Sequence, residues 1–179
     1  MKVRTVSYKS RNNSREFTQS LHQTGFSVLT DHPIDFQLID AVYNEWKIFF
    51  NDQRKHDYTF DIIKQDGYFP LGTENAKGAS LSDLKEFYHF YLWGKIPKGL
   101  SDNTKKLYEQ LVKLTSTLLS WIQDETPVDI KSLFSMPLPD MIKDSTSHLL
   151  RIIHYPPLNG TEQMGAIRGG AHEDINLIT

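Results

Sequence analysis

The chain reads LLRIIHYPP at residues 149–157 and GAHEDINLIT at residues 170–179. The first stretch is rich in apolar and β-branched residues and is halted by two prolines, which predicts a β-strand over residues 149–155. The second alternates polar and apolar residues, which predicts another strand over residues 171–179. Strands are therefore expected to accumulate at the end of the chain.

The sequence before these strands is expected to be mainly helical. Ser14 should cap a short helix that ends at Gly25, and a short strand should follow over residues 26–29. Pro33 should open a second helix that ends near residues 50 and 51. The longest helix should begin after Ser101 or Asp102 and reach about residue 124, because leucine and isoleucine form one stripe along it.

The aromatic segment FYHFYLW at residues 87–93 predicts a strand that is buried on both faces. Together with the expected helices, it indicates an α+β fold. A short ordered loop or strand edge should precede it at residues 66–72, where two glycines and a proline lie among aromatic residues.

Composition limits the classes of partner and of site. The 179 residues have a formal net charge of −2, so no overall field favours a nucleic acid or an anionic membrane. The absence of cysteine excludes disulfides, thiolate metal sites and a cysteine nucleophile. The N-terminus lacks the apolar run of a signal peptide, so a cytoplasmic protein is expected. Its oligomeric state is not indicated.

His172 and Asp174 form the pattern most relevant to chemistry. On a strand, residues two apart project from the same face, so this imidazole and carboxylate could reach one metal ion, with Glu173 and Ile175 on the other face. With a distant third ligand, such a pair makes the facial triad of non-haem Fe(II) enzymes. A solvated polar pair at a strand edge is the alternative, because a His-x-Asp triplet alone is a weak signal.

The context of the triplet resembles the Fe(II)/2-oxoglutarate oxygenases related to isopenicillin N synthase. RIIHYPP at residues 151–157 precedes the His-x-Asp segment as it does in that family. The first half of the chain is similar to the family's helical leader, with GFSVL at residues 25–29 and DHPI at residues 31–34. Further similarities are Gly67-Tyr68 and DLKEF at residues 83–87.

This resemblance implies a helical N-terminal region packed on a double-stranded β-helix, or jelly roll. Residues 1–100 would form the leader, 101–146 the long helix and connector, and 147–179 the first barrel strands. His172 and Asp174 would be the first two ligands of Fe(II), and Tyr155 would contact the co-substrate or the substrate. The implied reaction uses O2 and, in most members, 2-oxoglutarate to hydroxylate, desaturate or cyclise a small molecule.

The family's third histidine ligand and its arginine that pairs with 2-oxoglutarate have no counterpart by residue 179, and a closed jelly roll needs about eight strands. We therefore expect an incomplete barrel and an inactive isolated chain. Two alternatives remain open. The chain could be a non-catalytic binding or scaffold domain derived from the family, or part of a Zn²⁺ enzyme that uses the same two ligands.

Overall fold

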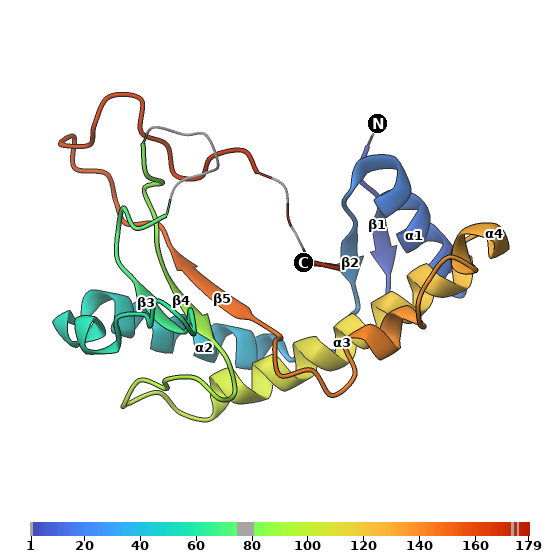
Figure 1. Ribbon diagram of the computed structural model, residues 1–179, viewed down its shortest axis with the longest axis horizontal. Coiled ribbons are helices and arrows are strands. Elements are labelled where there is room, and N and C mark those ends of the chain that lie inside the picture. Colours follow the sequence, from blue (N-terminus) through green and yellow to red (C-terminus); the bar gives the residue numbers. More distant parts are fainter. Residues whose placement is uncertain (1, 75–80, 173, 175) are drawn as a thin grey trace. The chain divides into compact units, whose positions relative to one another are not determined.

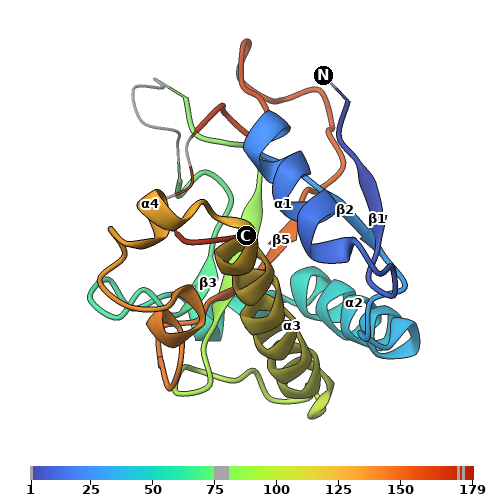
Figure 2. The same ribbon diagram turned by 90° about the vertical axis from the view of Figure 1, so that its right-hand side faces the viewer.

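The computed structural model describes residues 2–74, 81–172, 174 and 176–179. The chain forms two compact units: Met1–Phe36, Lys106–Ser145 and Ile178 make the first, and Gln37–Lys105, Thr146–Leu177 and Thr179 make the second. Both helices and strands occur, which confirms the predicted α+β class. Figures 1 and 2 show the elements in two views.

The first unit combines a small parallel sheet with helices. Strands β1 (Thr5–Ser7) and β2 (Val28–Thr30) pair in parallel, and α1 (Asn13–Thr24) lies beside them (Figure 2). The long helix α3 (Asn103–Glu125) begins in the second unit and continues in the first. Its Trp121 ring lies 5.1 Å from that of Tyr8 and 5.8 Å from that of Phe17. Two short helices follow, α4 (Val128–Lys131) and the 3-10 helix η2 (Leu138–Met141).

The boundaries of α1 test two predictions. Gly25 has φ 76° and donates its N–H to the Leu21 carbonyl, which confirms the left-handed helix end. Ser14, however, does not cap the helix, because α1 begins one residue earlier and the Ser14 hydroxyl donates to Glu125 Oε1 at 2.8 Å. The strand expected at residues 26–29 begins at Val28, because the Phe26 carbonyl accepts the Ser20 hydroxyl at 2.6 Å.

The second unit is built on an antiparallel sheet in the order β3 (Gly67–Phe69), β4 (Glu86–Phe90) and β5 (Leu150–His154). Helix α2 (Phe36–Asn51) covers one face of this sheet (Figure 1), and the 3-10 helix η1 (Gln53–Tyr58) follows it. The Trp46 and Phe49 rings lie 4.8 and 5.5 Å from the Tyr88 ring. This aromatic contact fixes α2 on the sheet.

The other face of the sheet carries a second aromatic group. Phe60 stacks on Phe69 at 4.1 Å, and Phe69 stacks on Phe87 at 4.5 Å. All five residues of β4 are buried, which confirms the expected strand with two covered faces. The strand is shorter than residues 87–93 because a turn follows, in which the Gly94 N–H donates to the Tyr91 carbonyl at 3.0 Å.

Gly67 lies at a close backbone approach at the start of β3. Its φ is 107°, and a Cβ there would lie 2.5 Å from the Tyr58 carbonyl oxygen. We expect Gly67→Ala to lower the free energy of unfolding of the full-length protein by at least about 1–3 kcal/mol, measured by urea denaturation. Gly99→Ala is the matched control, since Gly99 has φ 97° but open space around it. Equal losses in both variants would contradict the proposed clash.

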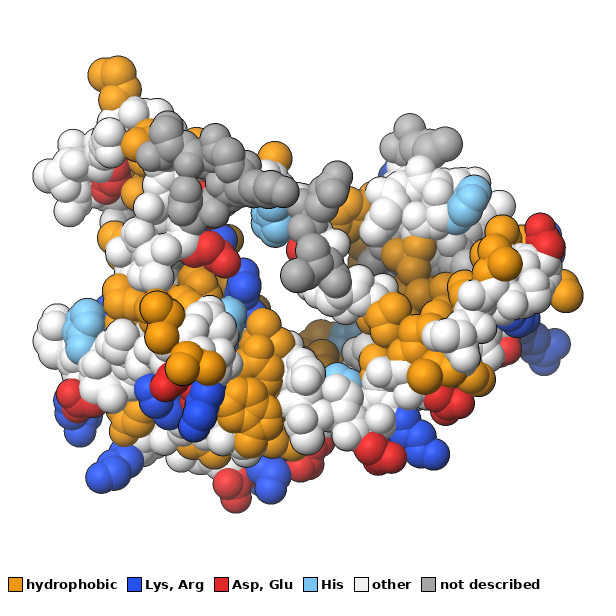
Figure 3. All heavy atoms as spheres, viewed as in Figure 1, with side chains coloured by type: hydrophobic (Ala, Val, Ile, Leu, Met, Phe, Trp, Pro, Cys, Tyr) orange, Lys and Arg blue, Asp and Glu red, His pale blue; other side chains and the backbone are white. Residues whose placement is uncertain are grey.

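None of the helices in the described ranges combines the length and the apolar character of a membrane-spanning segment. Acidic and basic side chains are interspersed on the face shown in Figure 3. That pattern agrees with the small net charge of the sequence.

Candidate metal-binding site

His172 and Asp174 lie side by side in the second unit. His172 Nε2 is 3.5 Å from Asp174 Oδ1, and the two side chains are 58% and 54% exposed. Two ligand atoms that each lie about 2.1 Å from one metal ion are roughly 3 Å apart at a right angle. The donor atoms are therefore close to the separation that one Fe(II) ion requires.

The hydrogen bonds of His172 leave its outer nitrogen available. His172 Nδ1 lies 2.9 Å from the Gly170 carbonyl oxygen, which can only accept a hydrogen bond. Nδ1 must therefore carry the proton, and a neutral ring then has its lone pair on Nε2. This is the tautomer that a metal needs, with the second ring nitrogen held by a carbonyl as is usual for histidine ligands.

Asp174 is oriented by its own neighbours. Its Oδ2 accepts a hydrogen bond from the Thr179 hydroxyl at 2.9 Å, and Asn176 Nδ2 donates to the same hydroxyl oxygen at 2.8 Å. Oδ1 remains directed toward His172. An imidazole nitrogen and a carboxylate oxygen suit a non-haem Fe(II) ion, so this pair fits part of such a site.

The predicted strand over residues 171–179 is wrong, because no described residue in this range adopts strand structure. A strand requires a neighbour for its backbone groups, whereas side chains of residues 174, 176 and 179 bond to one another instead. Glu173 and Ile175, expected on the opposite face, lie outside the described residues. The two candidate ligands are nevertheless close together.

Tyr155 directly follows β5 and is 42% exposed. The Arg168 guanidinium lies 6.0 Å from the centre of its ring, and Arg168 Nη1 donates to the Tyr155 carbonyl at 3.4 Å. Among the described residues, no hydrogen bond joins Tyr155 to His172 or Asp174. Its contact with a co-substrate stays a prediction.

Within the described part of the chain, no group of three histidine, aspartate or glutamate side chains is arranged to hold a metal ion. His154 contributes to another cluster, in which its Nδ1 lies 2.7 Å from Glu86 Oε1.

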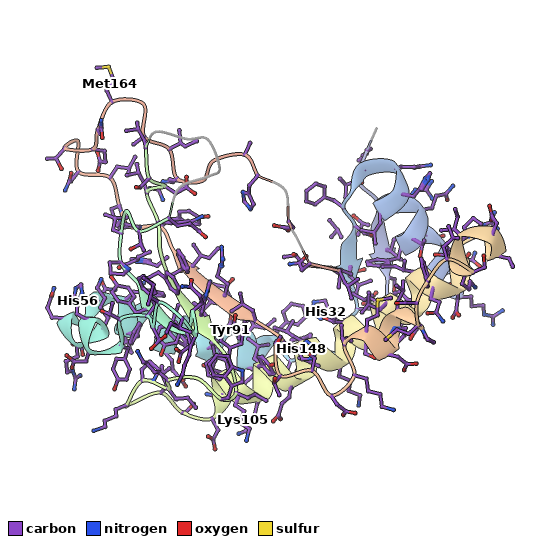
Figure 4. All side chains as sticks on the ribbon, in the orientation of Figure 1. His32, His56, Tyr91, Lys105, His148 and Met164 are labelled. Carbon is purple, nitrogen blue, oxygen red and sulfur yellow. The ribbon has the colours of Figure 1, made fainter. Side chains whose placement is uncertain are left out.

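The segment between β5 and His172 forms a long loop, and Met164 at its tip is 96% exposed (Figure 4).

A network of polar contacts lies beside the segment between β5 and His172. Its residues were not predicted to belong to a site. Arg151 Nε donates to His89 Nε2 at 3.0 Å, and its Nη1 lies 3.5 Å from Glu74 Oε2. Burial lowers the pKa of His89, which keeps its ring neutral and able to accept this bond. Lys85 Nζ lies 2.9 Å from both Glu74 Oε2 and Asp83 Oδ2. The signal in the sequence was a charged pair, Lys85-Glu86, at the start of an otherwise aromatic strand.

Comparisons with known proteins identify the family of the chain. Residues 6–112 match the family described as non-haem dioxygenase in morphine synthesis, N-terminal. A search of curated proteins found no match. A candidate oxygenase from Shewanella oneidensis is 46% identical with a TM-score of 0.87, and the alignment covers 99% of this chain and 63% of that one.

Two further solved structures are similar. A candidate 2OG-Fe(II) oxygenase family protein from Caulobacter crescentus is 27% identical with a TM-score of 0.69, over 97% of this chain and 61% of that chain. JOX2, solved in complex with 2OG, Fe and JA, shares the fold at 23% identity and a TM-score of 0.56, over 68% of this chain and 39% of that one. The chain thus spans about three-fifths of the length of its first two relatives. It belongs to the non-haem dioxygenases, within the Fe(II)/2-oxoglutarate oxygenase family.

Proposed function

We propose that the full-length protein is an Fe(II)- and 2-oxoglutarate-dependent dioxygenase that hydroxylates, desaturates or cyclises a small molecule in the cytoplasm. The observation that carries the proposal is the 3.5 Å separation of His172 Nε2 and Asp174 Oδ1, with Nδ1 of the same ring already bonded to Gly170. The family membership of the chain supports the same reaction class.

His172 and Asp174 would supply two of the three protein ligands of a facial triad. Because the chain spans only part of its relatives, we infer that the third ligand belongs to the remaining part of the full-length protein. In this proposal, β5 within residues 147–179 is the first strand of a jelly roll, with the metal near its mouth. Nucleic acid and membrane are not proposed as partners.

Bound Fe(II) would activate O2 while 2-oxoglutarate is decarboxylated to succinate and CO2, with one oxygen atom entering succinate and the other oxidising the substrate. The residues of this chain would orient the reactants. His172 presents the Nε2 lone pair, and Asp174 partly neutralises the metal charge. Tyr155 would contact the co-substrate or the substrate. The buried Phe69 and Phe87 rings would keep water from the neighbouring sheet face.

A binding experiment tests this proposal without knowledge of the substrate. We expect 2-oxoglutarate to bind the Mn(II)-loaded full-length protein by calorimetry and to bind the metal-free protein at least about tenfold more weakly, because chelation needs the metal. The Fe(II)-loaded protein should also consume 2-oxoglutarate and O2 and release succinate. A protein that binds neither Mn(II) nor 2-oxoglutarate would contradict the proposal and favour a non-catalytic binding domain. Activity with Zn²⁺ and without O2 would contradict it in favour of a hydrolytic metal enzyme.

A further inference from the structure

The segment that precedes His172 is hydrogen-bonded at two points to residues 83 and 84, which lie just before β4. The Gly170 N–H donates to Asp83 Oδ1 at 3.0 Å, and the Leu84 N–H donates to the Ile167 carbonyl at 2.8 Å. These contacts connect residues more than eighty positions apart in the sequence. They restrain both ends of the short stretch 167–170, which ends two residues before the candidate ligand His172.

Asp83 and Lys85 form a buried charged pair next to residues 167–170. Asp83 is 4% exposed and Lys85 is 7% exposed, and Lys85 Nζ bonds to both Asp83 and Glu74. Taking such charges out of water costs free energy that their mutual attraction often fails to recover. Stability alone therefore explains this buried ion pair poorly. Its contact with Gly170 indicates that it positions the backbone before His172.

The charge state of Asp83 suits that role. Burial alone would raise the pKa of its carboxyl group, but hydrogen bonds from Lys85 and from the Gly170 N–H outweigh burial and leave the pKa lowered. The carboxylate is therefore ionised at neutral pH. One oxygen accepts from Lys85 and the other from Gly170.

Gly170 connects this pair to the candidate ligand. Its N–H is held by Asp83, and its carbonyl accepts the Nδ1 proton of His172 at 2.9 Å. Fixing Gly170 thus fixes the acceptor that selects the His172 tautomer and directs Nε2 toward Asp174. Glu162 offers a contrast in the same loop, because it accepts the N–H groups of Asn159 and Gly160 and touches neither Gly170 nor His172.

We propose that Asp83 and Lys85 are positioning residues that hold His172, through Gly170, in the orientation required for metal binding. This inference rests on the proposed function, because it takes His172 to be a metal ligand. The Asp83–Lys85 pair touches no reacting atom. It acts on the metal only through the backbone of residue 170.

Metal affinity tests the proposal separately from catalysis. In the full-length protein, we expect Asp83→Asn to weaken Mn(II) binding by roughly 10–100-fold, the usual cost of losing a group that orients a ligand. The asparagine side chain has one acceptor oxygen instead of two, and the charged Lys85 ammonium competes for it more strongly than the neutral Gly170 N–H does. Free Mn(II) would be measured by electron paramagnetic resonance during titration. The thermal midpoint of each metal-free variant would be recorded in parallel.

Glu162→Gln is the matched control, since it alters a carboxylate that holds backbone N–H groups in the same loop. We expect its Mn(II) affinity to stay within about twofold of the wild type, because Glu162 does not orient a ligand. A folded Asp83→Asn protein with wild-type Mn(II) affinity would overturn the inference. An equal loss of affinity in Glu162→Gln would also overturn it, because any disturbance of the loop would then suffice.

Two further measurements keep the outcomes distinct. His172→Ala with wild-type Mn(II) affinity would overturn the proposed function itself, whereas loss in His172→Ala with no change in Asp83→Asn would overturn only the positioning role. If Asp83→Asn fails to fold, hydrogen exchange in the wild type still tests whether Asp83 holds the Gly170 N–H. The Gly170 amide should exchange more slowly than the amide of Met164 at the exposed loop tip, and an unprotected Gly170 amide would refute the tether.

Discussion

Replacing His172 or Asp174 by alanine in the full-length protein should abolish 2-oxoglutarate turnover and weaken Mn(II) binding by more than about 100-fold. Each change removes one of the two donor atoms that lie 3.5 Å apart in the structure. Neither side chain is buried, so the loss should occur without unfolding. Succinate release and Mn(II) titration would measure the two effects, and circular dichroism would verify the fold.

His22→Ala is the matched control for this experiment. His22 lies on the exposed surface of α1 in the first unit, and its replacement should leave both turnover and metal affinity unchanged. Uncoupled decarboxylation of 2-oxoglutarate that persists in both His172→Ala and Asp174→Ala would contradict the metal assignment. So would an equal loss of metal affinity in His22→Ala.

Glu86→Ala should be the most destabilising of the substitutions considered, with an expected loss of about 3–5 kcal/mol in the free energy of unfolding. Glu86 is buried in β4. Its Oε2 accepts hydrogen bonds from Lys55 Nζ, at 2.8 Å, and from the Tyr68 hydroxyl. Its Oε1 lies 2.7 Å from His154 Nδ1. Alanine would leave three buried or half-buried polar groups without this acceptor. Urea denaturation would measure the loss, with the exposed Glu109→Ala on α3 as a control that should change little.

The same residue predicts a dependence of stability on pH. Burial would raise the pKa of Glu86, but hydrogen bonds from Lys55, Tyr68 and His154 more than compensate, so its pKa lies below the ordinary value of 4.5. A lowered pKa means that the carboxylate stabilises the folded state above pH 4.5 and that this contribution is lost as the pH falls through the lowered value. The acid destabilisation should therefore be shallower in Glu86→Gln. An unchanged slope would show that Glu86 is not responsible.

The helices and the central strands could be predicted from the sequence because their signals are local. The stripe of apolar residues in α3 and the glycine at the end of α1 depend on neighbours within a few positions. Residues 150–154 form a strand as expected, and β4 is buried on both faces.

The candidate site was predicted only in part. Residues 172 and 174 are two positions apart, so their proximity did not require the strand that was wrongly expected there. The role of Asp83 could not be read from the sequence, because its partner Gly170 is brought near it only by folding. The charged pair Lys85-Glu86 at the start of an aromatic strand was the available signal, and it does not identify the partners of Asp83.

The proposed site has one metal ion bound to both His172 and Asp174. An anaerobic crystal structure of the full-length protein with Mn(II) and 2-oxoglutarate tests it most directly, with the metal located by its anomalous scattering. We expect His172 Nε2 and one Asp174 carboxylate oxygen at about 2.0–2.3 Å from the ion. A bound ion coordinated by other side chains, with His172 turned into solvent, would contradict it.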